Sequence, residues 1–246
     1  MRIRRKSWTE PKLMECAYFA ENPRELRGRW RECFSNPDHL LELEIGCGKG
    51  VSTARMAHEN PATNYVAIDE VRHVLAVAAR NADATYAPGA VTNLVLSAVD
   101  AMFIRDSFTA EDRISRIHIS FPNPWTERLK QHKRRLTHPR QLMQYREFLV
   151  PGGEIHFKTD DVELFRASRE YLAYCGFDIR YETEDLHASG YAPNYISEHE
   201  ALYAGQGVPI RFLIARKSEL PADFSWEFEG RPLDKIDRGG SDRRYI

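Results

Sequence analysis

The chain has 246 residues, 42% of them hydrophobic and 11% aromatic, so it can bury a substantial core and lies at the upper end of single-domain size. Its formal net charge of -1 conceals two basic clusters: Arg2, Arg4, Arg5 and Lys6 at the start, and seven Lys or Arg without an acid from residue 128 to 146. A membrane span and a signal peptide are both disfavoured, because no stretch reaches ~20 apolar residues and charged residues follow the basic start.

Residues 1–38 are polar and basic and end in a turn signal, so we expect an arm and lead-in segment before a strand at Leu40. Strand and helix patterns then alternate. Helices are expected at 51–59, 71–81, 139–149 and 161–175, and strands at 64–68, 91–99, 114–121 and 154–158. Two last strands, 177–181 and 210–216, would close the sheet, with an antiparallel pair as one option.

This alternation predicts an α/β fold: a mostly parallel, seven-stranded sheet with helices on both faces, in one domain at 39–217. From residue 218 to 246 the chain is polar and lacks a clear period, so we expect a tail that orders only on contact. Ligands of such sheets bind beyond the carboxyl ends of the strands, where the motifs of this chain fall.

A glycine-rich turn follows the strand at Leu40. Glu44 precedes three glycines, Gly46, Gly48 and Gly50, which carry no side chain to hold a ligand away from the backbone. A dinucleotide fingerprint needs its third glycine one place later, so a nicotinamide or flavin dinucleotide is disfavoured. Glu-Ile-Gly-x-Gly-x-Gly instead resembles the first motif of S-adenosylmethionine-dependent methyltransferases with a Rossmann-like fold.

Carboxylates follow the next two strands. Asp69 stands nineteen places after the last glycine, where Rossmann-like folds bind ribose hydroxyls, and Glu70 is its close competitor. Asp100 is placed to hold an adenine amino group, with the backbone amide of Ala101 against the ring. Each acid also has a plain reading as a helix cap.

A proline-stiffened turn follows the fourth strand. Pro122 and Pro124 flank Asn123 and fix the direction of its amide, which suits orienting a planar base, and Trp125 is able to stack on one or to be a core residue. The basic run that follows suggests a polyanion such as a phosphate backbone. Its proposed RNA contacts are Lys130, Lys133, Arg134 and Arg135.

Five motifs together resemble the bacterial tRNA (guanine-N7-)-methyltransferases, in the same order along the chain. They are Glu44 to Gly50, Phe121 to Trp125, His132 to Arg135, Lys158 to Asp160, and Ser197-x-x-Glu200 followed by Gly205-x-Gly207-x-Pro209-Ile210. The resemblance implies a class I methyltransferase that transfers a methyl group from S-adenosylmethionine to a guanine in the tRNA variable loop. It also implies cofactor contacts at Glu44, Asp69, Asp100 and Asn123, and substrate contacts at Arg128, Asp160, Ser197, Glu198, His199 and Glu200.

Three positions depart from the family pattern. Asn123 replaces an aspartate that is the usual candidate for the catalytic residue of the family. A neutral amide cannot act as a base, so two roles are open for Asn123: catalytic residue, or a residue that only orients ligands. Glu127 or Arg128 stands for the usual lysine, and Ser197 for a threonine. Guanine N7 already carries a free lone pair, so alignment matters more than a base, and Asp160 and Glu200 are expected to accept from the N–H groups of the guanine.

Two other readings stay open at this point. Asn-Pro-Trp is similar to the Asn-Pro-Pro-Tyr turn of methyltransferases that modify exocyclic amino groups, and Asn123 also allows a non-catalytic RNA-binding protein with a relic cofactor pocket. Four scattered cysteines, without metal-ligand spacing, predict neither a disulfide framework nor a zinc site and fit a reducing cytoplasm. We expect tRNA as the partner, and no protein partner is indicated.

Overall fold

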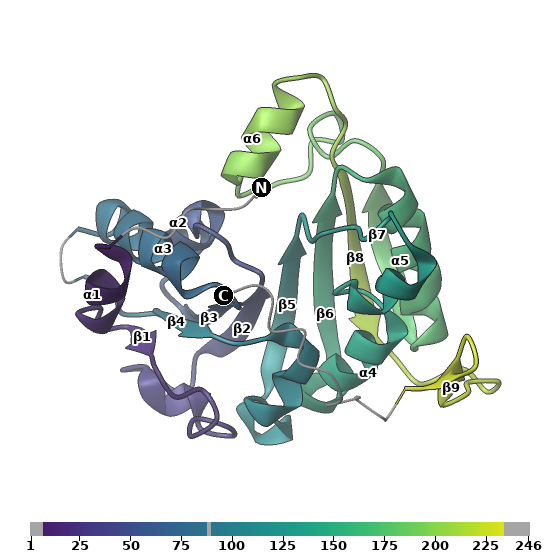
Figure 1. Cartoon of the computed structure of the whole chain (residues 1–246), viewed down its shortest axis with the longest axis horizontal. Helices are drawn as coiled ribbons and strands as arrows, with labels where there is room; N and C mark the ends of the chain where they lie inside the picture. Colours follow the sequence, from purple (N-terminus) through teal and green to yellow (C-terminus); the bar gives the residue numbers. More distant parts are fainter. Residues whose placement is uncertain (1–6, 88–89, 234–246) are drawn as a thin grey trace.

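The computed structural model describes residues 7–87 and 90–233. One sheet forms its centre, in the strand order β1-β4-β3-β2-β5-β6-β8-β7 (Figure 1). Its strands are β1 (Phe19–Ala20), β2 (Leu40–Ile45), β3 (Thr63–Asp69), β4 (Leu94–Ala98), β5 (Ile114–Ser120), β6 (Leu149–Thr159), β7 (Phe177–Thr183) and β8 (Arg211–Lys217).

All neighbours from β1 to β6 pair in parallel, whereas β8 is antiparallel to both β6 and β7. The predicted α/β class and the antiparallel closing pair are therefore confirmed. The strand count is one higher than the predicted seven, because Phe19 and Ala20 add a short parallel strand beside β4.

The helices are α1 (Thr9–Met14), which precedes β1, and, between the later strands, α2 (Val51–Glu59), α3 (Arg72–Thr85), α4 (Pro139–Phe148), α5 (Val162–Tyr174) and α6 (Glu198–Ala204). Short 3₁₀ turns lie at η1 (Trp30–Cys33), η2 (Ala101–Asp106), η3 (Ala110–Asp112) and η4 (Leu129–Arg134). No helix of the described residues is long and apolar enough to cross a membrane.

Side-chain alternation along the central strands builds two cores, one on each face of the sheet. In β3, Tyr65 and Ala67 pack in the cluster with α1, α2 and α3, whereas Val66 and Ile68 join the cluster that holds α4 and α5. Successive side chains of a strand point to opposite faces, so an apolar run without alternation is what a doubly covered strand requires.

The strand predicted at 154–158 begins five residues earlier than expected. Pro151, Gly152 and Gly153 predict a break before Glu154, but β6 begins at Leu149 and runs through them. The pairing of β5 with β6 shifts register between Ile114 and Arg116, so an irregular stretch of the ladder accommodates the proline and glycines.

The segment before β2 packs on the domain along its described part. Trp30 is fully buried, its indole N–H donates to the Ser107 carbonyl at 2.8 Å, and its ring stacks on Phe108 at 5.1 Å. The four predicted cations of the arm, in residues 1–6, lie outside the described residues.

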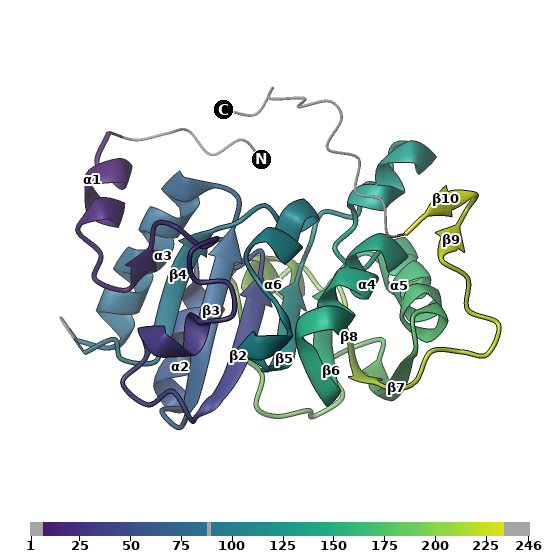
Figure 2. The ribbon, with the colours of Figure 1, turned by 90° about the horizontal axis from the view of Figure 1, so that it is seen from below.

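The expectation of a tail without fixed structure is wrong for residues 218–233. They carry a small hairpin of β9 (Glu227–Phe228) and β10 (Arg231–Pro232), which lies beside α5 (Figure 2). Tyr174 of α5 donates its hydroxyl to the carbonyls of Ser225 at 2.8 Å and Glu227 at 3.0 Å, and Leu233 is buried. The rest of the predicted tail lies outside the described residues.

Candidate active site

The motifs singled out in the sequence meet at one edge of the sheet. Each follows the carboxyl end of a strand, from the glycine turn after β2 to Asp160 after β6. Helix α6 lies beyond the tips of β5 and β6, at the same edge (Figure 1). Parallel strands place such segments side by side, so a ligand at this edge can be reached from several strands at once.

Two of the three glycines in the turn have different structural roles. All have left-handed backbone, with φ of 77° at Gly46, 55° at Gly48 and 65° at Gly50. A Cβ on Gly50 would lie 2.8 Å from the Cβ of Ala78, so this glycine lets α2 and α3 approach each other. A Cβ on Gly48 would meet nothing within 4 Å, so this glycine leaves open space beside the backbone for a ligand.

This difference predicts opposite outcomes for two matched substitutions. Gly50→Ala is expected to lower the free energy of unfolding by about 2–4 kcal/mol, because left-handed strain and the Ala78 contact add. Gly48→Ala should cost only about 1–2 kcal/mol of strain yet weaken cofactor binding. Urea unfolding and calorimetric titration with S-adenosylmethionine separate the two; equal losses of stability would contradict the assignment.

Asp69 is tied into the glycine turn. One carboxylate oxygen accepts from the backbone N–H of Gly48 at 3.1 Å and the other from that of Val71 at 2.9 Å. Burial raises the pKa of Asp69, and these two N–H donors oppose that rise. A carboxylate has about four lone-pair sites, so Asp69 orders the turn and keeps acceptor capacity for a ligand.

Two further carboxylates lie near Asp69. Glu70 lies at the surface, where partial desolvation of its carboxyl group, together with the charges of Asp100 and Asp69, raises its pKa. Asp100 caps η2 by accepting from the backbone N–H of Met102 at 2.8 Å, with Ala101 between them. The capping interpretation of Asp100 therefore holds, and its exposed carboxylate remains beside the other two acids.

Glu44 lies beneath the turn rather than on its surface. Its side chain is buried, and it accepts a hydrogen bond from the hydroxyl of Thr53 in α2. Burial raises the pKa of Glu44, an effect that the Thr53 hydroxyl and the charges of His118 and Lys158 oppose. Sequence reasoning missed Thr53, which joins the end of β2 to the first turns of α2.

A side-chain-to-backbone hydrogen bond closes the Asn123 turn. The Asn123 side-chain oxygen accepts from the backbone N–H of Trp125 at 3.0 Å, and Phe121 and Trp125 both have positive φ. The guanidinium of Arg134 lies 5.1 Å from the centre of the Trp125 ring. The Trp125 ring is therefore already paired with a cation on one side.

Arg135 has a structural position and not the RNA contact that the basic run suggested. Its side chain is 1% exposed, donates to the Pro124 carbonyl at 2.7 Å and pairs with Glu163 at 2.8 Å. It therefore anchors the basic run to the Asn123 turn. Arg128 and Lys130 are exposed, and Lys133 is half-buried.

Glu200 also points inward. Its side chain is fully buried, and it contacts Lys158 at 3.1 Å, Asn194 at 2.7 Å and His187 at 3.1 Å. Lys158 donates in addition to the Asn194 side chain and to the Tyr195 carbonyl at 3.2 Å. Burial lowers the pKa of Lys158, against the opposing charge of Glu200. This network fastens the segment 187–200 to the end of β6.

The neighbours of Glu200 form the outer part of the site. Asp160 accepts from His199 at 3.1 Å, and the His199 ring stacks on Tyr203 at 4.3 Å. Ser197 caps α6 by accepting from the Glu200 backbone N–H at 3.1 Å.

Glu198 pairs with Lys49 of the glycine turn at 2.7 Å, so α6 contacts that turn. The sequence analysis included Lys158 only as part of a motif, and it did not identify Asn194 or His187 as site residues. The one signal for Asn194 was its position as a polar residue directly after Pro193.

Fold and site together define a Rossmann-like class I methyltransferase. Residues 38–212 match the model of a family described as "Putative methyltransferase". The structure is similar to that of the 16S rRNA methyltransferase KamB, with a TM-score of 0.54, 15% identity, and 73% of this chain and 88% of that chain covered.

Two curated relatives extend the comparison over nearly the whole chain. Both are named tRNA (guanine-N(7)-)-methyltransferase and are 48% identical: one from Clostridium perfringens (strain SM101 / Type A) over 219 residues and one from Acetivibrio thermocellus over 220 residues. Each alignment covers 88% of this chain and 100% of the relative. The chain belongs to the tRNA (guanine-N7-)-methyltransferase family.

Proposed function

We propose that this protein transfers a methyl group from S-adenosylmethionine to N7 of a guanine in the variable loop of tRNA, which gives 7-methylguanosine. The observation that carries this proposal is the 48% identity to tRNA (guanine-N(7)-)-methyltransferases over their full length. The structure adds a site in which a glycine turn, three acids and the Asn123 turn meet at one sheet edge.

The residues at this edge fit the methyl donor. Open space beside Gly48 suits close approach of a ligand to the backbone, and Asp69 keeps acceptor sites for ribose hydroxyls. Asp100 and Ala101 would receive the adenine, with Glu70 and Asn123 at the margin and Gly46 and Glu44 shaping the floor. When bound, S-adenosylmethionine supplies an electrophilic methyl group on a sulfonium.

The residues of the chain then have to align the guanine. N7 carries a lone pair, so no base is needed, and the catalytic term is the orientation of the ring. We assign that task to Asp160, His199 and the Asn123 turn. Glu200 is reassigned: with its carboxylate buried among Lys158, Asn194 and His187, it holds the segment 187–200 and does not face a guanine.

One assay tests the proposal. The protein is incubated with unmodified tRNA and S-adenosylmethionine labelled in the methyl group, and the digested tRNA is analysed for nucleosides. We expect label in 7-methylguanosine. Label in a base methylated on an exocyclic amino group would support the first alternative, and binding of S-adenosylmethionine without any transfer would support the relic-pocket alternative.

The Asn123→Asp substitution is expected to keep kcat/KM for tRNA within about threefold of the natural chain. Aspartate can accept from the Trp125 N–H in the same way, so the turn is retained, and no base is required. Asn123→Ala, which removes the acceptor, should lower kcat/KM by about tenfold. Inactive but folded Asn123→Asp protein would show that the neutral amide itself is essential.

A further inference from the structure

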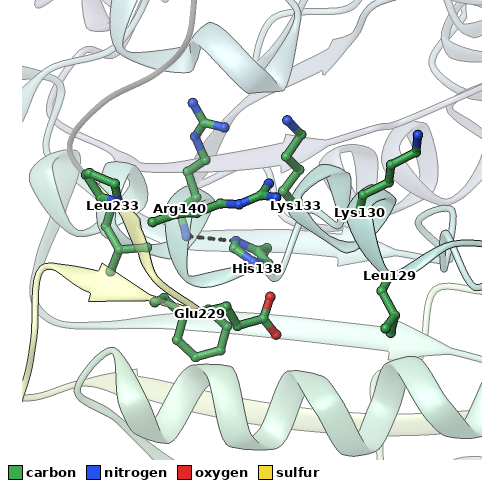
Figure 3. Close-up of a pocket in the computed structure, with 10 residues that line it drawn as sticks. Leu129, Lys130, Lys133, His138, Arg140, Glu229 and Leu233 are labelled. Atoms are coloured by element: carbon green, nitrogen blue, oxygen red, sulfur yellow. Dashed lines mark hydrogen bonds between the residues drawn. The ribbon is translucent and has the colours of Figure 1, made fainter.

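A cavity of about 450 Å³ lies outside the candidate active site, between the basic run and the C-terminal hairpin. Lys130, Lys133, His138 and Arg140 line one side, and Phe228, Glu229 and Arg231 of the hairpin line the other. Figure 3 shows the side chains of Lys130, Lys133 and Arg140 extending in the same direction from this wall.

The cavity concentrates positive charge. It holds four Lys or Arg side chains against one acid, Glu229, and none of Lys130, Lys133 and Arg231 forms an ion pair within residues 7–87 and 90–233. Burial and the charges of Arg140, Arg135 and Arg231 lower the pKa of His138 to about 4. Burial is the larger cause of this shift, and the neighbouring cations act in the same direction.

The hairpin is fixed firmly enough to present its arginine. The Phe228 ring packs edge-to-face with the rings of His138 and Tyr174, with centroid distances of 5.5 Å and 5.1 Å. The Tyr174 hydroxyl also donates to two backbone carbonyls, those of Ser225 and Glu227. The backbone N–H of Leu233 donates to the Trp226 carbonyl at 2.7 Å and closes the hairpin. These contacts hold Arg231 opposite the lysines.

The other wall is tied to the active site. Arg135, inside the same basic run, donates to the Pro124 carbonyl of the Asn123 turn at 2.7 Å. A group held in the cavity is therefore placed relative to the turn that orients the guanine. Lysines act as point charges on flexible stems, which suits a phosphate approached from several sides.

We propose that this cavity is a phosphate site for the backbone of the RNA substrate, and that the hairpin at residues 226–233 is an RNA-binding element. The inference rests on the proposed function, because it takes tRNA as the ligand. The polar composition of residues 218–246 did not indicate this substrate-binding role of the hairpin.

The test is the salt dependence of tRNA binding by the full chain. In Arg231→Ala, the slope of log K against log salt concentration should fall by about 0.7–0.9, as for one lost phosphate contact, and KM for tRNA should rise about tenfold. The kcat at saturating tRNA and the affinity for S-adenosylmethionine should stay unchanged. Arg231→Lys should keep the natural slope.

Two further variants test whether the docked hairpin is responsible. Phe228→Ala retains Arg231 but removes the ring that docks the hairpin, so it should lose the same part of the slope. Arg180→Ala removes an exposed arginine that already pairs with Asp178 on β7, and should leave the slope unchanged.

If the natural chain methylates tRNA but Arg231→Ala leaves both the salt slope and KM unchanged, the phosphate site alone is overturned. If Arg231→Ala and Arg180→Ala lower the salt slope by the same amount, the phosphate site is overturned as well. No methylation of tRNA by the natural chain would instead contradict the proposed function.

Discussion

Lys158→Met is expected to slow methyl transfer to tRNA by about 100-fold or more, with the affinity for S-adenosylmethionine kept within about threefold. Lys158 is 14% exposed and contacts Glu200, Asn194 and the Tyr195 carbonyl. Without Lys158, the buried carboxylate of Glu200 would have no cationic lysine beside it, and breaking such a buried pair costs about 3–5 kcal/mol of stability. The segment 187–200 can relieve this cost by opening, and the opening would move His199 away from Asp160.

Single-turnover kinetics with saturating tRNA measure this loss directly. Arg169→Met is the matched control, because Arg169 pairs with Glu182 at 2.7 Å with both side chains over 40% exposed. An exposed pair contributes about 0–1 kcal/mol, so this variant should retain its rate. Equal rates for Lys158→Met and the natural chain would remove the segment 187–200 from the catalytic arrangement.

Glu200→Ala should likewise reduce methyl transfer far more than cofactor binding, but through position and not through contact with the guanine. A double-mutant cycle separates the two explanations. If Glu200 acts through Lys158, combining Lys158→Met with Glu200→Ala adds little to either single loss. Fully additive losses would mean that Glu200 meets the substrate independently.

The buried network around Glu200 also shows where sequence reasoning stops. The strand ends were predictable, because apolar runs followed by Gly46, Asp69 or Asn123 indicate both the strand and its polar end. Whether Glu200 faces a ligand or the protein is decided by Lys158, Asn194 and His187, which lie elsewhere in the chain. Neither the period nor the local spacing of a seven-residue helix carries that information.

The hairpin at residues 226–233 escaped prediction for a related reason. Its two strands have two residues each, too short for an alternating pattern to be seen. Phe228 packs against Tyr171 and Tyr174 of α5 and against His138, and Leu233 is buried in the core, so the hairpin depends on where the helices lie. Arg135 shows the converse: it lies in a run of cations typical of a solvated face, yet it is 1% exposed.

Asp69→Ala is expected to weaken binding of S-adenosylmethionine by about 100-fold. The substitution removes the proposed ribose acceptor and leaves the N–H groups of Gly48 and Val71 without their partner, so the turn loses its order. Asp69→Asn should lie between, because its single side-chain oxygen can replace only part of the two contacts. Calorimetric titration with S-adenosylmethionine gives the affinities, and thermal melts confirm that each variant is folded.

Glu70→Gln is the matched control, since it removes one charge from the neighbouring residue. Glu70 is exposed and forms no hydrogen bond or ion pair with the part of the chain that the structure describes, so its loss should change affinity by less than about threefold. A larger effect at Glu70 than at Asp69 would transfer the ribose contact to Glu70. The sequence alone could not separate these adjacent acids. The two N–H donors make Asp69 the acid that orders the turn, and for that reason we assign the ribose contact to it.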